Sequence, residues 1–249
     1  MADIFSLYWE GPPFVLFSVP HWIALGCVVA AAVWVLGPAR HLSPMAARWW
    51  RYGLAAVLTI NELAYNVWFW VHGLWSIQYM LPLHLCTLFT WLSVIMLLTR
   101  SYRIFEFAYF MGIGGAVQAL LTPDIGIYGF PHFRAFQSFI SHGGIVLAAL
   151  TMIALEQYRP TWGSVGRVIV GANLLMAIVG MINWLLDSNY LFLARKPYTP
   201  SLLDFLGPWP IYIVWMEIIG IITILVLYAP FALADLRQRS PITASRVRR

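Results

Sequence analysis

Seven long apolar segments follow one another along the chain, and they constrain its fold more than any other feature. They lie at residues 20–37, 48–71, 81–98, 102–121, 134–155, 164–186 and 208–231. A helix needs about 20 apolar residues to cross the hydrocarbon core of a bilayer. Hydrophobic residues make up 61% of the sequence and charged residues only 10%, far below the charged share of soluble domains. The sequence therefore predicts an all-α fold in which residues 1–249 form a single domain, a bundle of seven transmembrane helices.

Basic residues are divided unequally between the two ends of this predicted bundle. Of the fifteen Lys and Arg residues, twelve lie in the connections between segments one and two, three and four, and five and six, in the first turn of the segment that follows, or after segment seven. Only Arg134, Arg195 and Lys196 belong to the other end. Because loops rich in Lys and Arg stay in the cytoplasm, we expect the N-terminus outside and a basic cytoplasmic tail at 237–249. The basic tail suits anionic lipid headgroups, and the sequence has no basic domain that would indicate a nucleic-acid partner.

Alternate segments begin in a similar way. Segments one, three, five and seven open with a proline, and the first three of them carry a histidine directly after it or two residues later. These histidines are His21, His84 and His132. A proline at the first helical position loses no hydrogen bond, because that N–H would have no helical partner. If alternate helices enter the bilayer from the same side, their starts and these imidazoles cluster at the outer end.

Two acidic residues lie deep inside predicted helices. Glu62 is about ten residues, or about 15 Å, from the outer end of its segment, and Glu217 reaches a similar depth in the last one. Ionisable groups at that depth usually face a partner or a water-filled cavity. Asn66 lies one turn after Glu62 and could equally form interhelical hydrogen bonds. The two glutamates favour a polar cavity that opens outward.

Cys86 is the candidate nucleophile, about one turn inside the outer start of segment 81–98. A helix N-terminus carries unpaired N–H groups and roughly half a positive charge, which favour a thiolate. A thiol beside an imidazole base is sufficient for acyl transfer through a thioester. We expect His142 to be that base, since His84 is two residues from Cys86 and would point about 200° away on a regular helix.

Two other interpretations of these residues remain open. A cysteine inside a membrane helix is often a small apolar filler. Three histidines with Asp124 or Asp187 could also bind zinc and leave a position open for water. However, the sequence has no HxxxH or HExxH spacing that would place two ligands on one helix face. We therefore predict no metal ion and no other cofactor.

Several segments of the sequence resemble the YwaF family of bacterial integral membrane proteins. They are LPLHLC (81–86), FPHFRAFQSFISHG (130–143), NYLFL (189–193), KP (196–197) and DFLGPWP (204–210). The YwaF family is related to the animal transmembrane protein 164 family, whose members transfer phospholipid acyl groups with a catalytic cysteine. The resemblance implies that Cys86 is this cysteine and that the protein lies in the cytoplasmic (inner) membrane.

Together these features predict a lipid-modifying enzyme, an acyltransferase or acyl hydrolase that acts on membrane phospholipids. In this hypothesis Cys86 attacks an ester carbonyl and His142 is the general base. The residues expected to bind the lipid phosphate or shape the pocket are His21, His84, His132, Arg134, Gln137, Glu62, Asn66, Asn189 and Asp204. The alternative is a transporter or binding protein for a small anion or lipid headgroup, with Glu62 and Glu217 as proton or cation carriers.

Overall fold

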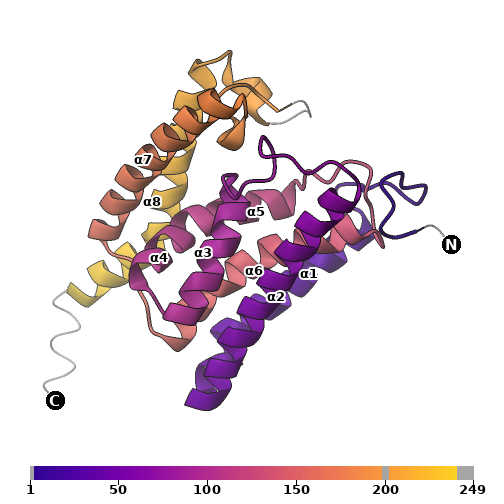
Figure 1. Ribbon diagram of the computed structural model, residues 1–249. Helices are drawn as coiled ribbons and strands as arrows, with labels where there is room; N and C mark the ends of the chain where they lie inside the picture. Colours follow the sequence, from indigo (N-terminus) through magenta and orange to yellow (C-terminus); the bar gives the residue numbers. More distant parts are fainter. Residues whose placement is uncertain (1–2, 198–201, 240–249) are drawn as a thin grey trace, which may run out of the picture.

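The computed structural model describes residues 3–197 and 202–239, and this part of the chain contains helices and loops but no strand (Figure 1). The α-helices are α1 (Val19–Leu36), α2 (Pro44–Val71), α3 (Leu85–Thr99), α4 (Tyr102–Phe107), α5 (Ile113–Leu121), α6 (Phe133–Leu155), α7 (Trp162–Leu186) and α8 (Ile211–Arg239). Shorter helical turns are η1 (Pro38–His41), η2 (Ala108–Gly112), η3 (Tyr190–Phe192) and η4 (Leu202–Leu206). The all-α prediction is confirmed for the described residues.

Six of the seven predicted segments form helices that are long and apolar enough to cross a membrane, so the protein is a multi-pass membrane protein. The exception is α3, whose 15 residues span about 22 Å, less than the roughly 30 Å of a hydrocarbon core. Helix α3 begins at Leu85, later than the predicted start at residue 81. Residues 81–84 form a turn instead, in which Leu83 N donates a hydrogen bond to Leu81 O at 2.7 Å, so Pro82 precedes the helix.

In three of the four alternate segments the opening proline precedes the helix instead of standing at its first position. Pro20 lies in the first turn of α1, as expected. In contrast, α3, α6 and α8 begin two or three residues after the prolines that open their segments. His84 and His132 are consequently N-cap residues with extended backbones, outside the helices that they precede.

Helix α6 is the centre of the bundle and contacts α1, α2, α3 and α5. Two adjacent glycines allow this close packing. A Cβ added to Gly144 would lie 2.5 Å from Leu58 Cδ2 of α2, and one added to Gly143 would lie 2.9 Å from Val28 Cγ2 of α1. Small residues let helix backbones approach closely in membranes, where packing rather than water drives helix association.

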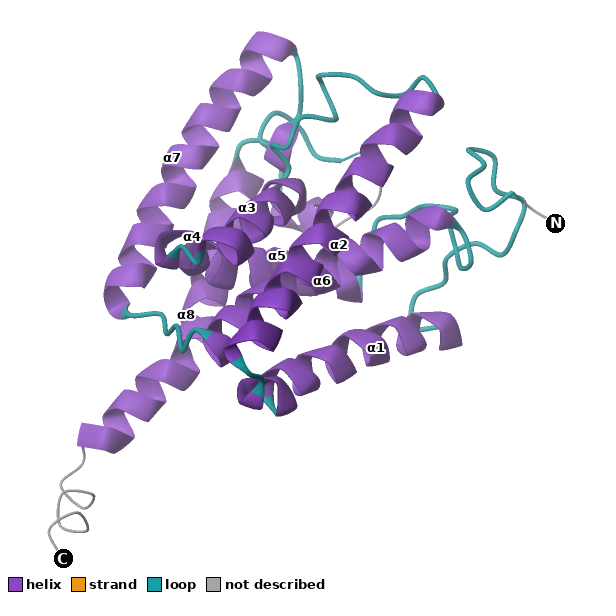
Figure 2. Cartoon of the chain, turned by 60° about the horizontal axis from the view of Figure 1, so that its bottom comes forward, coloured by secondary structure: helices purple, strands orange, loops and turns teal. Residues whose placement is uncertain are grey.

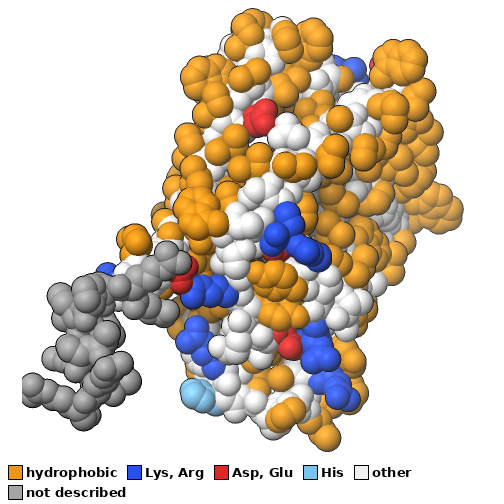
Figure 3. All heavy atoms as spheres, turned by 90° about the vertical axis from the view of Figure 1, so that its left-hand side faces the viewer, with side chains coloured by type: hydrophobic (Ala, Val, Ile, Leu, Met, Phe, Trp, Pro, Cys, Tyr) orange, Lys and Arg blue, Asp and Glu red, His pale blue; other side chains and the backbone are white. Residues whose placement is uncertain are grey.

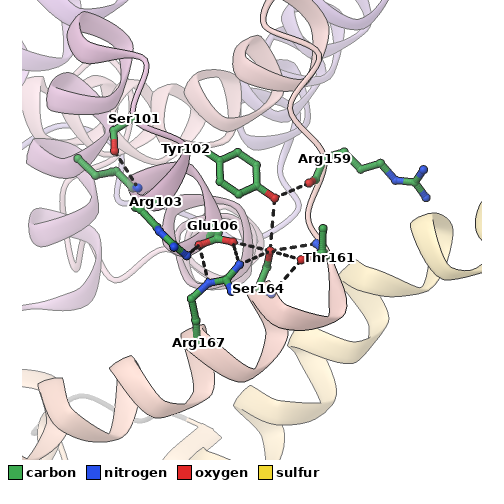
Figure 4. Close-up of polar contacts among 9 residues, drawn as sticks. Ser101, Tyr102, Arg103, Glu106, Arg159, Thr161, Ser164 and Arg167 are labelled. Atoms are coloured by element: carbon green, nitrogen blue, oxygen red, sulfur yellow. Dashed lines mark hydrogen bonds and ion pairs between the residues drawn. The ribbon is translucent and has the colours of Figure 1, made fainter.

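Helices α7 and α8 stand together at one side of the bundle, orange and yellow in Figure 1. A buried ion cluster joins α7 to α4 (Figure 4). Glu106 of α4 is fully buried and accepts hydrogen bonds from Arg167 Nε at 3.1 Å and from Ser164 Oγ at 2.6 Å. Arg103 pairs with the same carboxylate at 3.4 Å. Such charge-assisted hydrogen bonds are stronger than neutral ones, so the cluster fixes the position of α7.

The two ends of the bundle differ in chemistry. The end that we call the histidine end carries the N-terminal segment and the α2–α3, α5–α6 and α7–α8 connections, whose longer loops gather near the N-terminus in Figure 2. Hydrogen bonds tie these loops together, for example Tyr128 Oη of the α5–α6 connection to Leu7 O of the N-terminal segment at 3.0 Å. The opposite end, the arginine end, carries the α1–α2, α3–α4 and α6–α7 connections, and Lys and Arg side chains gather there in Figure 3. Which end faces the cytoplasm stays a prediction, and residues 240–249 of the predicted tail lie outside the described residues.

Candidate functional site

Three helix connections enclose a cavity of about 230 Å³ at the histidine end, which we call the loop pocket. The α2–α3 and α5–α6 connections form one part of its lining, and the α7–α8 connection forms the rest. The lining residues are Tyr79, His84, Asp124, Asn189, Phe192, Arg195 and Pro197. Two of the predicted site residues, His84 and Asn189, are therefore brought together although more than 100 residues separate them in the chain.

His84 is the titratable residue of the loop pocket that is best placed to exchange a proton. Its backbone is extended (φ −70°, ψ 146°), because it caps α3 instead of belonging to it. Its ring packs edge-on against Tyr190, with centroids 5.0 Å apart, and no described residue is hydrogen-bonded to its ring nitrogens. Burial lowers the pKa of His84 below its usual value of 6.5. The imidazole is therefore neutral at pH 7 and can accept a proton.

Asn189 shapes the pocket through its own loop. Its Oδ1 accepts hydrogen bonds from the backbone N–H groups of Ala194 and Arg195 at 3.1 and 3.0 Å, and its Nδ2 donates to Arg195 O at 2.8 Å. This turn holds Arg195 at the pocket, where Arg195 Nε is buried without a hydrogen-bond acceptor among the described residues. A buried donor without a partner is costly, so this position suits an anionic oxygen of a ligand.

Cys86 is the second residue of α3 and follows the pocket residue His84 by two positions. Its thiol is half-buried and packs against the hydrophobic core. A Cβ added to Gly115 of α5 would lie 3.8 Å from Cys86 Sγ. Because apolar surroundings disfavour a thiolate, the helix N-terminus alone does not activate this thiol, and a base is needed. Cys27, the other free cysteine, is exposed on α1.

His142, the predicted base, lies deeper in the bundle than Cys86. Thr90 Oγ1 of α3 and Ser141 Oγ of α6 are 3.1 Å apart, and this contact fixes the register of the two helices. Cys86 lies one turn before Thr90 on α3, whereas His142 directly follows Ser141 on α6. Because both helices start at the histidine end, Cys86 lies on the histidine-end side of the Thr90–Ser141 contact and His142 on the other side. His142 Nδ1 is 2.8 Å from the carbonyl oxygen of Ser138, one turn back on its own helix. Within the described residues, no hydrogen bond joins His142 to Cys86.

Four more predicted residues meet between α2 and α6. The Arg134 guanidinium hydrogen-bonds to Gln137 and lies 4.4 Å from the centre of the Tyr65 ring. Glu62 is 2% exposed, accepts a hydrogen bond from Asn66 Nδ2 at 3.3 Å and is attracted by the charge of Arg134. The predicted polar residues Glu62 and Asn66 of α2 thus share a buried environment with Arg134 and Gln137 of α6.

His21 and His132 are built into the fold. Both side chains are fully buried. His21 Nδ1 accepts a hydrogen bond from Phe17 N at 2.9 Å, and its Nε2 is 2.9 Å from Leu120 O. His132 Nδ1 accepts from Arg134 N at 3.0 Å, and its Nε2 is 2.9 Å from Ser6 O. Neither imidazole presents a free nitrogen to a phosphate, so we assign both to the fold and not to the site.

The remaining predicted residues lie elsewhere. Asp204 is exposed on η4, where its backbone carbonyl is 3.4 Å from Lys196 Nζ, and it does not line the loop pocket. Glu217 of α8 accepts a hydrogen bond from Asn173 Nδ2 of α7 at 2.9 Å. In the described ranges 3–197 and 202–239, no three His, Cys, Asp or Glu side chains gather closely enough to hold a metal ion.

Two residues of the site were not singled out from the sequence. Tyr190 is fully buried, donates to Ile77 O at 2.6 Å and accepts from Leu81 N at 3.0 Å, so it orders the turn before α3. Tyr190 belongs to the NYLFL segment (189–193) that carries the family resemblance, but the sequence predicts no role for it. Arg195 did carry a signal, because it is one of only three basic residues expected at this end.

Comparison with known proteins shows that the chain matches one protein family. The model of the TMEM164 family matches residues 16–228, which include Cys86, His142 and every residue that lines the loop pocket. No curated protein and no solved structure is significantly similar to the chain.

Proposed function

This chain belongs to the TMEM164 family, and we propose that it is a phospholipid acyltransferase or acyl hydrolase with Cys86 as its nucleophile. The observation that carries the proposal is the position of Cys86 on the first turn of α3, two residues after His84, whose side chain lines the loop pocket. Unpaired N–H groups of that first turn are suitably placed to stabilise an oxyanion.

The proposed reaction has two steps. First, the imidazole takes the thiol proton, and the thiolate adds to the carbonyl carbon of a phospholipid ester. The ester C–O bond breaks, the lysophospholipid leaves with the proton from the imidazolium, and the acyl group remains on Cys86 as a thioester. Second, the hydroxyl of an acceptor lipid, or water, gives its proton to the imidazole and attacks the thioester. The C–S bond breaks, the acyl group leaves with the acceptor, and the Cys86 thiolate takes the proton from the imidazolium, which restores the thiol.

Two imidazoles compete for the role of base. The sequence favours His142, which needs a bridging water or a shift of α3 against α6 to reach the thiol. His84 gains support from the structure, because it stands outside the helix and the 200° separation expected on a regular helix does not apply to it. Its ring nitrogens are also free of hydrogen bonds to the described residues, whereas His142 Nδ1 contacts Ser138.

A lipid phosphate is the ligand that we propose for Arg195 in the loop pocket, whose lining also includes the carboxylate of Asp124. Arg195 contributes a buried Nε without an acceptor, and Asn189 holds this arginine in place. A guanidinium suits phosphate because its planar donors can engage two oxygens at once. The phosphate-binding role proposed for His21 and His132 therefore passes to Arg195.

The alternative function as a transporter has less support. It requires Glu62 and Glu217 to share a pathway, but they contact different helices. Glu62 is paired between α2 and α6, whereas Glu217 is paired between α8 and α7.

The proposal is tested by acylation of the purified protein with a phospholipid that carries an alkyne in its acyl chain. We expect a label on Cys86 that neutral hydroxylamine removes, as it does a thioester. Cys86→Ala should abolish the label and reduce lipid turnover by at least about 1,000-fold, the scale of losing a nucleophile. The matched control is Cys27→Ala, which should keep both. Unchanged turnover in Cys86→Ala would exclude the nucleophile.

The base is identified by the pH dependence of labelling in His84→Gln and His142→Gln. Loss of the base should slow acylation at pH 7 and leave partial recovery at alkaline pH, where hydroxide ionises the thiol. A variant with a purely structural defect should be slow at every pH. In proteoliposomes, anion flux that survives Cys86→Ala but fails in Glu62→Gln would favour the transport alternative.

A further inference from the structure

A second and larger cavity, of about 630 Å³, lies at the arginine end of the bundle. It is formed by η1, the first turns of α2, the end of α3 and the end of α6. The charged side chains that line it are Arg40, Arg48, Arg51, Arg100 and Glu156. We call this cavity the arginine pocket.

Arg51 is the buried member of the arginine pocket, with 6% of its surface exposed. Its Nη1 donates a hydrogen bond to Leu97 O, at the end of α3, at 2.7 Å. Its Nε is 3.4 Å from Glu156 Oε1 but has no hydrogen-bond acceptor in the described part of the chain. A buried cationic donor without an acceptor is unfavourable unless a ligand or water supplies the missing oxygen.

The charges around the arginine pocket do not balance. Glu156 is the one acidic residue of the lining, and both Arg51 and Arg100 pair with it, at 3.4 and 3.7 Å. Four guanidinium groups therefore face a single carboxylate, which leaves an excess of three positive charges. Helix α2 also begins at this cavity, at Pro44, and its N-terminus adds a partial positive charge. An anion that occupied the cavity would neutralise both sources.

We propose that the arginine pocket binds a phosphate-bearing anion, either the headgroup of an anionic phospholipid or a soluble phosphate compound. Guanidinium groups prefer phosphate because they donate two parallel hydrogen bonds to its oxygens. The volume lies within the range of small-molecule sites and exceeds what inorganic phosphate alone would fill. Exposed apolar side chains beside the cavity, such as Trp49 and Leu98, offer a surface for acyl chains.

This site is separate from the proposed acyl-transfer site. Cys86 lies in the first turn of α3 and the arginine pocket at its last, about 20 Å away along a helix of 15 residues. Ligand binding here can therefore be tested without any assumption about the chemistry of Cys86.

The test measures binding to the purified full-length protein in a neutral maltoside detergent, read out as a shift in thermal unfolding. The probes are dioctanoyl phosphatidylglycerol, dioctanoyl phosphatidylcholine and inorganic phosphate. The pocket variants are Arg48→Gln, which changes an exposed residue and should fold normally, and Arg51→Lys, which keeps the charge but loses the planar donors. The matched control is Arg237→Gln, which removes one exposed positive charge near the end of α8, outside the pocket.

We expect phosphatidylglycerol to stabilise the protein more than phosphatidylcholine does. Its apparent affinity should fall at least fivefold in Arg48→Gln and at least tenfold in Arg51→Lys, and stay within twofold in Arg237→Gln. Equal stabilisation by inorganic phosphate, lost in the same variants, would support the site and identify a soluble phosphate as a sufficient ligand. An equal loss in Arg237→Gln would show a general charge effect and overturn the proposal, as would the absence of binding by every probe.

Discussion

Two glutamates, Glu106 and Glu62, are both buried inside helices that are long enough to cross the membrane, but their surroundings differ. Glu106 is covered by the side chains of Arg103 and Arg167 and also accepts a hydrogen bond from Ser164. The Glu62 carboxylate accepts one hydrogen bond from the Asn66 amide, at 3.3 Å, and the charge of Arg134 acts on it from a greater distance.

The difference separates a carboxylate that joins two helices from one that can still accept further hydrogen bonds. A buried charge is stabilised when each of its oxygens is hydrogen-bonded and its charge is neutralised. Glu106 meets both conditions and connects α4 to α7, whereas Glu62 meets them only in part. The sequence drew attention to Glu62 because of its depth and overlooked Glu106, which lies near the start of its segment among arginines. Depth alone therefore does not show which acidic residue has a partner.

The largest effect on stability is expected for Glu106→Gln. The substitution keeps the shape of the side chain but removes the charge that two arginines and a serine surround. We expect a loss of about 2 kcal/mol in the free energy of unfolding, the scale of hydrogen bonds to a charged group, moderated because the arginines are partly exposed to solvent. The measurement is SDS-induced unfolding, with Glu217→Gln as the matched control, since among the described residues only Asn173 is hydrogen-bonded to that carboxylate. Equal losses of stability in the two variants would contradict the proposal that Glu106 holds α4 and α7 together.

An intermediate effect is expected from acid at the histidine end. Burial lowers the pKa of His132 below its usual value of 6.5. The unfolded chain then binds a proton more readily than the folded one, so the contribution of His132 is complete above about pH 6.5 and declines as the pH falls toward the folded pKa. Protonation of Nδ1 would also break the hydrogen bond from Arg134 N that caps α6.

This prediction is checked with His132→Asn, which keeps a good N-cap and removes the titrating ring. Unfolding free energies measured from pH 8 to pH 5 should decline less in the variant than in the wild-type protein. Parallel pH curves for the two proteins would show that other groups cause the acid sensitivity.

The smallest effect on stability is expected for Glu62→Gln, at less than about 1 kcal/mol, because the amide can still accept a hydrogen bond from Asn66. The same variant should reduce acylation of Cys86 if the cluster of Glu62 and Arg134 orients the lipid. A loss of stability as large as that of Glu106→Gln would remove the distinction between the two glutamates. Normal stability with normal acylation would leave Glu62 without a role in the site.

Prediction from sequence succeeded for the helical segments, which composition determines, and failed for the roles of individual histidines, which depend on tertiary contacts. The helical segments followed from runs of apolar residues, although α3 begins four residues later than predicted, after a turn at residues 81–84. The histidine cluster was expected from alternate helix starts, but its members have different roles. His21 and His132 use both ring nitrogens within the fold, whereas His84 lines a pocket with neither nitrogen hydrogen-bonded to a described residue.

The sequence by itself determined that the chain is a membrane-spanning helical bundle with its basic residues at one end, because hydrophobicity and charge act through composition along each segment. The tertiary structure decided which polar groups are already paired. Arg51 and Glu156 meet only because α2 and α6 pack together, and Tyr190 reaches the turn before α3 only because the α7–α8 connection folds over it. Hydrogen-bond partners depend on distances between helices, and no local pattern of residues encodes those distances.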